Sequence, residues 1–342
     1  MKKVQSFLND GGTIKDLMYK AKEAYPTNAA FKVKADGEIK TITFIQMMKD
    51  VESLGTELSA RGFDGKRMGI IGENSYEWFN CFLSIVCGGN IAVPFDKGLT
   101  AEELAQCVER SDIKVLFYDD KHKDLVDKIK QQCSKELELF RITGNENDLD
   151  EMRTAGNIKM TAGDRSYLDR PVNRSDLAVF LFTSGTTSTS KVVMLSHDNI
   201  ASNITDMLQM KIFYPTDVNM AFLPFHHSFG LVGCLVFLSS ASANVFCDGL
   251  KYVAKNLEEY GVTVFVGVPL IVENLYNKIM KQVEKQGMTA KVNKGLKLAS
   301  MLDKIGIHQR RRIFAEIIKK LGGHLRLIIC GAASLSKEVA IG

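Results

Sequence analysis

The amino-acid sequence predicts an α/β protein with two mostly parallel sheets and helices on their faces. Short apolar segments rich in Val, Ile and Phe alternate with amphipathic segments of helical length along most of the chain. A polar stretch over 143–175 with weak periodicity interrupts the alternation and is expected to be a linker or loop region. A chain of 342 residues with 45% apolar and 25% charged residues is globular in composition and long enough for more than one core. We therefore predict a first α/β subdomain over 1–165 and a second over 166–342.

Periodicity and turn residues predict the elements of the first half. The turn ADGE lies between two apolar runs and predicts a hairpin, and Thr100 with Glu103 forms a capping box. The segment GENSYEWF is expected to open a helix that buries Trp78. The other predicted helices span 13–25, 44–61, 101–110 and 121–133, and the predicted strands span 30–33, 39–43, 68–71, 91–93, 115–118 and 137–142.

The second half repeats the alternation. Its most apolar window, 229–246, is interrupted by Ser and Asn and is too short to span a bilayer, so it is expected to be a buried helix followed by a strand. The other predicted strands span 177–182, 192–195, 218–223, 262–266 and 325–330, and the predicted helices span 199–211, 251–260, 269–285 and 307–321.

Cysteines and charge bound the class of protein. The seven cysteines are scattered, form no C-x-x-C pair and lie mostly in apolar runs, which is typical of reduced thiols in a cytoplasmic protein rather than a zinc site. The N-terminus MKKVQSFLNDGG has no apolar core of a secretory signal. Residues 278–326 hold thirteen Lys or Arg against three acids. This basic segment could contact an acidic membrane face peripherally or bind a phosphorylated cofactor, or it could be a pair of solvated helices.

One predicted loop has a composition that indicates a binding site. Residues 183–190 contain seven Ser or Thr and one Gly, and Lys191 follows them. Hydroxyls, backbone N–H groups and one ammonium suit a polyphosphate, and Gly185 allows a close backbone approach. Because 177–182 and 192–195 are apolar and strand-like, the loop is expected to connect two strands.

Two other interpretations of this loop are less favourable. A flexible Ser/Thr-rich linker seldom lies between two buried strands. The P-loop of an NTPase requires Gly before its Lys and Ser or Thr after it, and it opens a helix. Here Ser190 and Val192 flank Lys191, and the β-branched run VVML follows. The NTPase motif is therefore excluded.

The stretch TSGTTSTSK followed by VVMLSH resembles the phosphate-loop signature of the AMP-forming adenylating enzymes, a superfamily that includes acyl-CoA synthetases. The usual family pattern has Gly, Pro and Gly where this chain has Ser188, Ser190 and Val192. The resemblance implies that ATP is bound by Thr183, Ser184, Gly185, Thr186, Thr187, Ser188 and Lys191, with Thr183 also a ligand of Mg²⁺.

Two further stretches resemble signatures of the same family, in the family's order. LPFHHSFG resembles the segment whose His lies beside the acyl carboxylate, and the matching residue is His227. GAASLS at 331–336 resembles the segment that packs against adenine, which implies a role for Gly331, Ala332 and Ala333. Without the resemblance, a core histidine would be the commoner explanation of His227, and GAAS would be a common small-residue turn.

The resemblance implies a ligase reaction in two steps. A carboxylic acid and ATP give acyl-AMP and pyrophosphate, and the thiol of CoA then displaces AMP. Lys191 and His227 are the implied catalytic residues. VGVPLIVENLYNKI and the insertion that follows resemble fatty-acid–CoA ligases, which favours a medium or long acyl chain. No nucleic-acid partner is expected, and the oligomeric state is left open.

The resemblance covers the larger part of the family's N-terminal domain. The family's Y-G-x-T-E signature and small C-terminal domain have no counterpart in the sequence, so we expect a truncated chain with weak ATP binding and negligible turnover. Two alternatives stay open: an adenylating enzyme that loads a carrier protein, and a non-catalytic nucleotide- or lipid-binding module.

Overall fold

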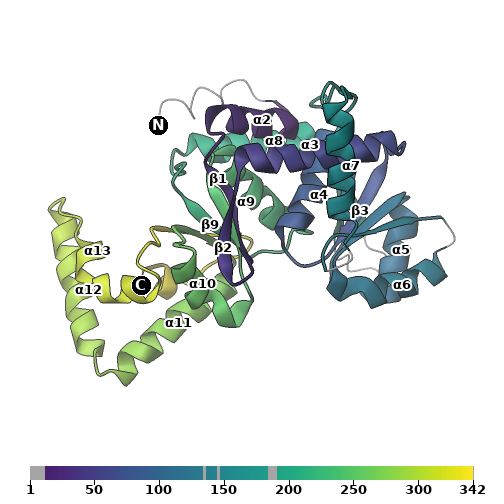
Figure 1. The fold of residues 1–342 in the computed structure, drawn as a ribbon. Coiled ribbons are helices and arrows are strands. Elements are labelled where there is room, and N and C mark those ends of the chain that lie inside the picture. Colours follow the sequence, from purple (N-terminus) through teal and green to yellow (C-terminus); the bar gives the residue numbers. More distant parts are fainter. Residues whose placement is uncertain (1–11, 134–135, 145–146, 184–190, 342) are drawn as a thin grey trace. The chain divides into compact units, whose positions relative to one another are not determined.

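The computed structural model describes residues 12–133, 136–144, 147–183 and 191–341 (Figure 1). It contains two six-stranded, mostly parallel sheets with flanking helices, so the predicted α/β class is confirmed. The chain forms two compact units. Unit one comprises residues 1–216 and 224–244, and unit two comprises 217–223 and 245–342. The sequence-based division at residue 166 stays a prediction.

The first sheet lies wholly in unit one and has the strand order β6-β5-β3-β4-β7-β8. Its strands are β3 (Arg67–Ile71), β4 (Ile91–Pro94), β5 (Val115–Tyr118), β6 (Glu138–Arg141), β7 (Leu177–Thr183) and β8 (Lys191–Ser196). The first five are parallel to their neighbours, and β8 pairs antiparallel with β7. The carboxyl ends of five strands and the start of β8 therefore share one edge of the sheet.

Helices cover both faces of this sheet (Figure 1). Helices α5 (Ala101–Ser111) and α6 (Lys123–Gln132) bury Leu104, Val126 and Ile129 in one cluster with the strands. Helices α3 (Phe44–Ala60) and α4 (Tyr76–Cys87) lie on the other side, and α4 contacts β3 and β4. The predicted capping box of α5 is confirmed, because Thr100 and Glu103 cap each other's backbone.

The predicted hairpin near the N-terminus is also confirmed. It consists of β1 (Ala29–Ala35) and β2 (Glu38–Thr43), and it follows helix α2 (Ile14–Ala24). Its two turn residues, Asp36 and Gly37, have φ angles of 55° and 80°. This left-handed pair is what a two-residue hairpin turn requires, and Asp-Gly is a favoured sequence for it.

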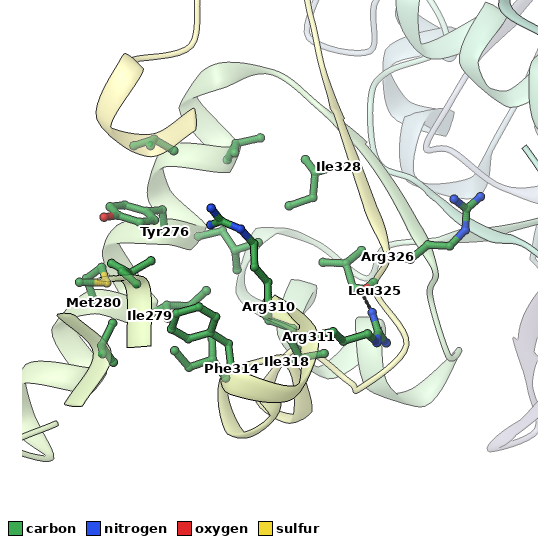
Figure 2. Close-up of a pocket in the computed structure, with 17 residues that line it drawn as sticks. Tyr276, Ile279, Met280, Arg310, Arg311, Phe314, Ile318, Leu325, Arg326 and Ile328 are labelled. Carbon is green, nitrogen blue, oxygen red and sulfur yellow. Dashed lines mark hydrogen bonds between the residues drawn. The ribbon is translucent and has the colours of Figure 1, made fainter. Parts of the chain in front are cut away.

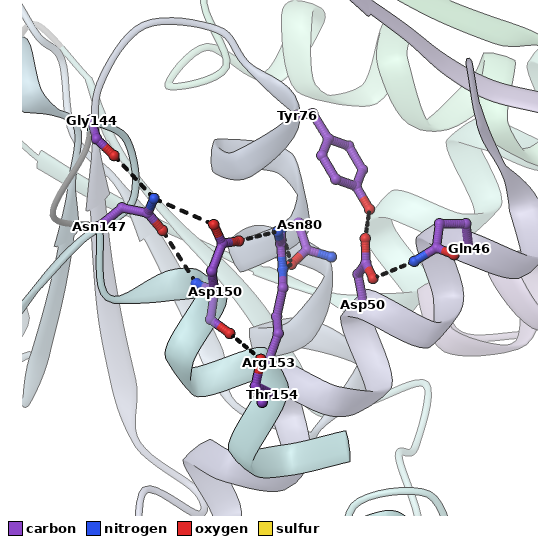
Figure 3. Close-up of polar contacts among 9 residues, drawn as sticks. All are labelled: Gln46, Asp50, Tyr76, Asn80, Gly144, Asn147, Asp150, Arg153 and Thr154. Atoms are coloured by element: carbon purple, nitrogen blue, oxygen red, sulfur yellow. Dashed lines mark hydrogen bonds and ion pairs between the residues drawn. The ribbon is translucent and has the colours of Figure 1, made fainter. Parts of the chain in front are cut away.

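The predicted loop over 143–175 is wrong in part, because α7 (Leu149–Thr161) lies within it. Helix α7 packs against α3 at Gly156, where an added Cβ would lie 1.8 Å from the Ser53 carbonyl oxygen. Arg153 donates from Nε and Nη2 to Asn80 Oδ1 at 3.1 and 2.8 Å and so fixes α7 to α4 (Figure 3). Tertiary contacts, rather than apolar periodicity, therefore hold this helix in place.

The apolar window over 229–246 forms a buried helix and a strand, as predicted. These are α9 (Ser228–Ser239), buried along most of its length, and β10 (Ala243–Phe246). Helix α8 (His197–Gln209) begins at the Ser196 cap and contacts α9. In the described part of the chain, no helix is both long and apolar enough to cross a bilayer.

Unit two is built on the parallel strands β9 (Val218–Ala221), β11 (Val264–Gly267) and β12 (Leu327–Cys330). Buried Asp217 joins their amino ends, because Thr263 Oγ1 and Arg326 Nε each donate to its Oδ1 at 2.8 Å. The helices are α10 (Val253–Glu259), α11 (Pro269–Lys285), α12 (Thr289–Lys304), α13 (Arg310–Ile313), α14 (Ala315–Lys320) and α15 (Lys337–Ile341). Two 3₁₀ turns, η1 (Asp120–His122) and η2 (Leu250–Tyr252), precede α6 and α10.

The basic segment of unit two differs from its prediction. The single helix predicted over 307–321 is two short helices, α13 and α14, because Phe314 between them has ψ 23° and ends the first. Helix α12 was not predicted at all. Its lysines alternate with apolar residues on both sides of the helix, which obscures the helical period.

Candidate functional site

The predicted phosphate loop is carried by a β-hairpin. Thr183, the last residue of β7, pairs with Lys191, the first residue of β8. Both side chains are exposed at the carboxyl edge of the first sheet. The prediction of a strand-to-strand loop is therefore confirmed. Five residues predicted to bind ATP lie outside the described residues: Ser184, Gly185, Thr186, Thr187 and Ser188.

The neighbouring strand β4 ends beside this hairpin. Phe95, directly after β4, stacks on Phe182 of β7 with ring centroids 5.8 Å apart. Asp96 and Lys97 follow, so they emerge at the same edge as Thr183. Lys97 forms an ion pair with Glu73, which follows β3.

This ion pair joins the carboxyl ends of two neighbouring parallel strands, β3 and β4. The topological switch point of the sheet lies on the other side of β3, between β3 and β5, because the connection from β3 runs to β4 and the connection from β5 runs the opposite way to β6. In open α/β sheets the crevice at such a point, outside the carboxyl ends of the strands, is where ligands bind. Glu73 therefore borders the crevice where a ligand is expected, and Asp96 and Lys97 lie at the end of the next strand.

The two histidines of LPFHHSFG lie in the same unit. His227 is the N-cap residue of α9 and is exposed, and its ring centroid lies 4.2 Å from that of His226. The His226 side chain is mostly buried, and its Nε2 lies 3.5 Å from Asp96 Oδ1. Burial lowers the pKa of His226 to about 4, although the Asp96 carboxylate acts in the opposite direction. His226 is therefore neutral at physiological pH.

Asp119 fixes the backbone at the end of β3 and β5. Its Oδ2 accepts from the Glu73 N–H at 2.7 Å, and its Oδ1 accepts from the His122 N–H at 3.1 Å. Burial alone would raise the pKa of Asp119, but the hydrogen bonds from His122 and Glu73 outweigh it and lower the pKa. The carboxylate is thus ionised and holds Glu73 in position at the switch point.

The predicted adenine segment belongs to unit two. The Gly331 N–H donates to the Gly267 carbonyl at 3.2 Å, so the segment leaves β12 beside the end of β11. Ala332 has a φ of 70°, a left-handed conformation that is uncommon for a residue with a side chain. Ala332 and Ala333 are exposed, which leaves the backbone of this turn accessible. The segment thus lies at the carboxyl edge of its own parallel strands.

Unit two also contains an apolar cavity of about 420 Å³ (Figure 2). Such a volume is within the range of small-molecule sites. Figure 2 shows the Arg310 side chain among the apolar residues, and its Nε donates to Asp303 Oδ2 at 2.7 Å. The lining consists of Val272, Leu275, Tyr276, Ile279, Met280, Val292, Leu296, Arg310, Arg311, Phe314, Ile317, Ile318, Leu321, Leu325, Arg326, Ile328 and Val339.

Among the described residues, the Thr183 hydroxyl is the predicted ligand of a magnesium ion. Thr183 Oγ1 is exposed beside Lys191, which suits a metal held mainly by phosphate oxygens. The described part of the chain has no group of three or more His, Cys, Asp or Glu that could hold a metal by itself. The residues fit a phosphate-bound Mg²⁺ better than a metal caged by protein.

Sequence reasoning missed three polar residues at the first sheet: Glu73, Asp96 and Lys97. Each follows a strand that was predicted, so their position at a carboxyl edge was in principle available from the sequence. The sequence did not show that they are neighbours, because the strand order that places β4 between β3 and β7 has no local signal in the sequence. His226 was noted only as the neighbour of His227.

Comparison with known proteins identifies relatives for the chain. Residues 18–341 match the family model described as "AMP-binding enzyme". A relative from Rattus norvegicus named "Long-chain-fatty-acid--CoA ligase 5" is 29% identical over 332 residues, which cover 90% of this chain and 48% of the relative. "Long chain acyl-CoA synthetase 4" of Arabidopsis thaliana is 24% identical over 364 residues, covering 95% of this chain and 53% of the relative. The chain thus spans about half the length of the curated relatives it matches.

Solved structures share the fold. The complex of VinN with L-aspartate superposes with a TM-score of 0.73 at 20% identity and covers 96% of this chain and 72% of that one. The N-terminal domain of FACL13 from Mycobacterium tuberculosis gives a TM-score of 0.72 at 18% identity, with the same coverage of 96% and 72%. At these identities the likeness concerns the fold alone.

Proposed function

Because the chain belongs to the AMP-binding enzyme family, we propose that it acts in ATP-dependent activation of a carboxylic acid, first to acyl-AMP and then to acyl-CoA. One observation carries the proposal. The pairing of Thr183 with Lys191 places one hydroxyl and one ammonium, from the two residues that flank segment 184–190, at the carboxyl edge of a parallel sheet. That edge is where an open α/β sheet binds a nucleotide.

In the first proposed step, a carboxylate oxygen attacks the α-phosphorus of ATP and the bond to pyrophosphate breaks. The carboxylate is already ionised at neutral pH, so no general base is needed. Lys191 supplies positive charge to the phosphates, and charge neutralisation with positioning is the main requirement of phosphoryl transfer. A Mg²⁺ held by the phosphates and Thr183 would add to that neutralisation.

His227 is proposed to orient the carboxylate. Its ring is exposed at the N-terminus of α9, where the helix dipole favours an anion. His226, neutral and placed next to Asp96, packs against the His227 ring and restricts it. His227 therefore acts as a hydrogen-bond donor to the carboxylate and not as a base.

In the second proposed step, the sulfur of CoA attacks the acyl carbonyl carbon. The bond between that carbon and the phosphate oxygen breaks, and AMP leaves. The thiol loses its proton in this step, and a thioester forms. The small residues Gly331, Ala332 and Ala333 are proposed to pack against the adenine ring, because their exposed backbone leaves room for a flat base. The identities of the acid and of the thiol acceptor are both proposed for the whole protein.

We propose that the acid carries a medium or long acyl chain. The relatives with the names given above are long-chain ligases, which favours such a substrate. The apolar cavity of unit two offers a volume of about 420 Å³ for an alkyl chain.

Titration of the 342-residue chain with ATP tests the proposed site. Lys191→Ala is expected to weaken ATP binding by about 10-fold to 100-fold, the usual effect of losing a hydrogen bond between charged groups. The measurement is isothermal titration calorimetry with ATP and Mg²⁺. Lys123→Ala, which removes an exposed lysine at the start of α6, is the matched control. If Lys191→Ala and the unmodified chain bind ATP with equal affinity, Lys191 does not contribute to the site.

A coupled assay tests the reaction itself. In the whole protein, release of pyrophosphate that depends on an added fatty acid is expected to decrease in Lys191→Ala and not in Lys123→Ala. Formation of the thioester with free CoA, rather than with a phosphopantetheine carrier protein, is the expected second product. Acyl transfer to the carrier alone would contradict the proposed acceptor.

A further inference from the structure

Helix α12 in unit two has a face of exposed apolar side chains. Leu298 and Met301 are 50% and 67% exposed, Ile305 at the C-cap is 68% exposed, and Ile307, three residues past the end of the helix, is 43% exposed. Positions 298, 301 and 305 are spaced by three and four residues, so these side chains lie in one row along the helix. A contiguous row of large exposed apolar residues marks an interaction surface more often than scattered ones do.

The opposite face of α12 is already packed. Val292 and Ala299 are buried, and Val292 and Leu296 line the cavity. At Gly295 an added Cβ would lie 3.1 Å from Ile313 and 3.2 Å from Phe314, so α12 approaches the end of α13 closely there. The orientation of α12 is thus fixed within its unit, and Leu298, Met301 and Ile305 cannot rotate into the core.

Lysines surround the exposed row. Lys291 and Lys294 continue it toward the start of α12, and Lys297 and Lys304 lie on one flank. All four side chains are exposed, and none forms an ion pair within the part of the chain that the structure describes. The surrounding residues 278–326 hold thirteen Lys or Arg and three acids. The face therefore combines apolar side chains with a local excess of positive charge.

We infer that this α12 face, formed by Lys294, Lys297, Leu298, Met301, Lys304 and Ile305, binds peripherally to a membrane surface rich in anionic lipids. Apolar side chains that enter the boundary of head groups and acyl chains, with lysines beside them, are the features of an interfacial helix. The lysines would contact lipid phosphates at the surface. A nucleic acid would match the lysines but would leave Leu298, Met301 and Ile305 without an apolar partner.

The inference goes beyond the proposed function and does not depend on it. Vesicle binding requires neither ATP nor catalysis, so the two can fail separately. If both hold, the protein would take up its acid at the surface where an amphiphile with a long chain concentrates.

Co-sedimentation with lipid vesicles tests the α12 face. The 342-residue chain is mixed with vesicles of phosphatidylcholine alone or of phosphatidylcholine with phosphatidylglycerol. Binding is expected to the vesicles with phosphatidylglycerol and to decrease as salt rises, because salt screens exposed charges. Lys294→Gln, Lys297→Gln and Lys304→Gln together are expected to lower the partition coefficient on the order of 100-fold, at about fivefold per lysine.

The apolar half of the face needs its own variant. Leu298→Gln, Met301→Gln and Ile305→Gln together are expected to lower the partition coefficient by at least about 10-fold, since they remove the buried apolar area. These side chains are exposed, so the fold is expected to be retained, and circular dichroism checks this. Ile305→Trp gives a second measurement: its fluorescence should shift to shorter wavelength on vesicle binding, while Trp78 is buried and constant.

Matched controls come from α6 of unit one. Lys123→Gln, Lys128→Gln and Lys130→Gln remove the same number of exposed lysines and should leave binding unchanged. Binding that is equal in the α12 and α6 variants, or absent from anionic vesicles at low salt, would overturn the inference. So would a dimer of the unmodified chain that the apolar variant dissociates without any effect on vesicles, because the face would then join two copies.

Discussion

Close contact at single residues explains much of unit one, and Gly156 is the clearest case. A side chain at this position would meet a backbone atom of α3, which cannot move away as a flexible side chain can. Gly156→Ala is therefore expected to lower the free energy of unfolding by about 3 kcal/mol, at the upper end of overpacking effects. Urea denaturation measures it. Ile158→Ala, at a 63% exposed site on the same helix, should change stability by less than about 0.5 kcal/mol.

A buried histidine makes the stability of unit one depend on pH. The Ile14 N–H donates to His197 Nδ1 at 3.3 Å, and Nε2 has no hydrogen-bond partner among the described residues. Burial lowers the pKa of His197 from 6.5 to about 4. The unfolded state thus binds more protons between these values, so stability is complete above pH 6.5 and decreases as pH falls toward 4.

The size of this effect is on the order of 3 kcal/mol. His197→Asn keeps an acceptor near the Ile14 N–H but cannot titrate, so its stability should fall less between pH 6.5 and pH 4. Thermal unfolding across this pH range is the measurement. His324→Asn, at an exposed position, should keep the slope of the unmodified chain. An identical slope in His197→Asn would show that other groups carry the pH dependence.

At the residue scale, motifs in the sequence located only part of the candidate site. Thr183, Lys191 and His227 were found because their spacing follows a local signature. Asp96, Lys97 and Glu73 were not, because nothing in the sequence indicates that the ends of β3, β4 and β7 are neighbours. Long-range pairing of strands determines this neighbourhood. The roles of all these residues stay predictions that the experiments above address.

At the scale of elements, strands and capped helices were the most predictable. The capping box at Thr100 and the Asp-Gly turn of the first hairpin depend on contacts within a few residues, and both were confirmed. Helices α7 and α12 were missed because neither has a clear apolar period. Packing of Gly156 on α3 and of Gly295 on the end of α13 holds them instead, and sequence periodicity does not report such contacts.

The two faces of α12 allow a paired test of the apolar cavity. Leu296 lines the cavity, whereas Leu298 is exposed on the other side of the helix. Leu296→Trp should fill part of the cavity and weaken displacement of a fluorescent fatty acid by palmitate about 10-fold. Leu298→Trp adds the same bulk outside it and should not. Equal displacement curves for the two variants would place the acyl chain elsewhere.

At the scale of the whole molecule, the fold class followed from the alternation of strands and helices. Short connections and right-handed crossovers leave few arrangements for such a chain. The order of strands in each sheet did not follow, because more than one of these arrangements is compatible with the same alternation. Residues 18–341 match the family model, and the chain spans about half the length of its curated relatives. The proposed function depends on these two findings. Substrate, acceptor and location of the whole protein are matters for the assays described.

The hairpin that carries the phosphate loop also has a consequence for chain entropy. Pairing of Thr183 with Lys191 joins the two ends of a seven-residue segment, residues 184–190, within one strand spacing. The entropy of closing that segment is thus lost when the sheet forms and not when a nucleotide binds. Closure entropy grows only with the logarithm of length, by about 0.6 kcal/mol per doubling. The stem of this hairpin could therefore carry a longer or shorter segment at little cost to the sheet.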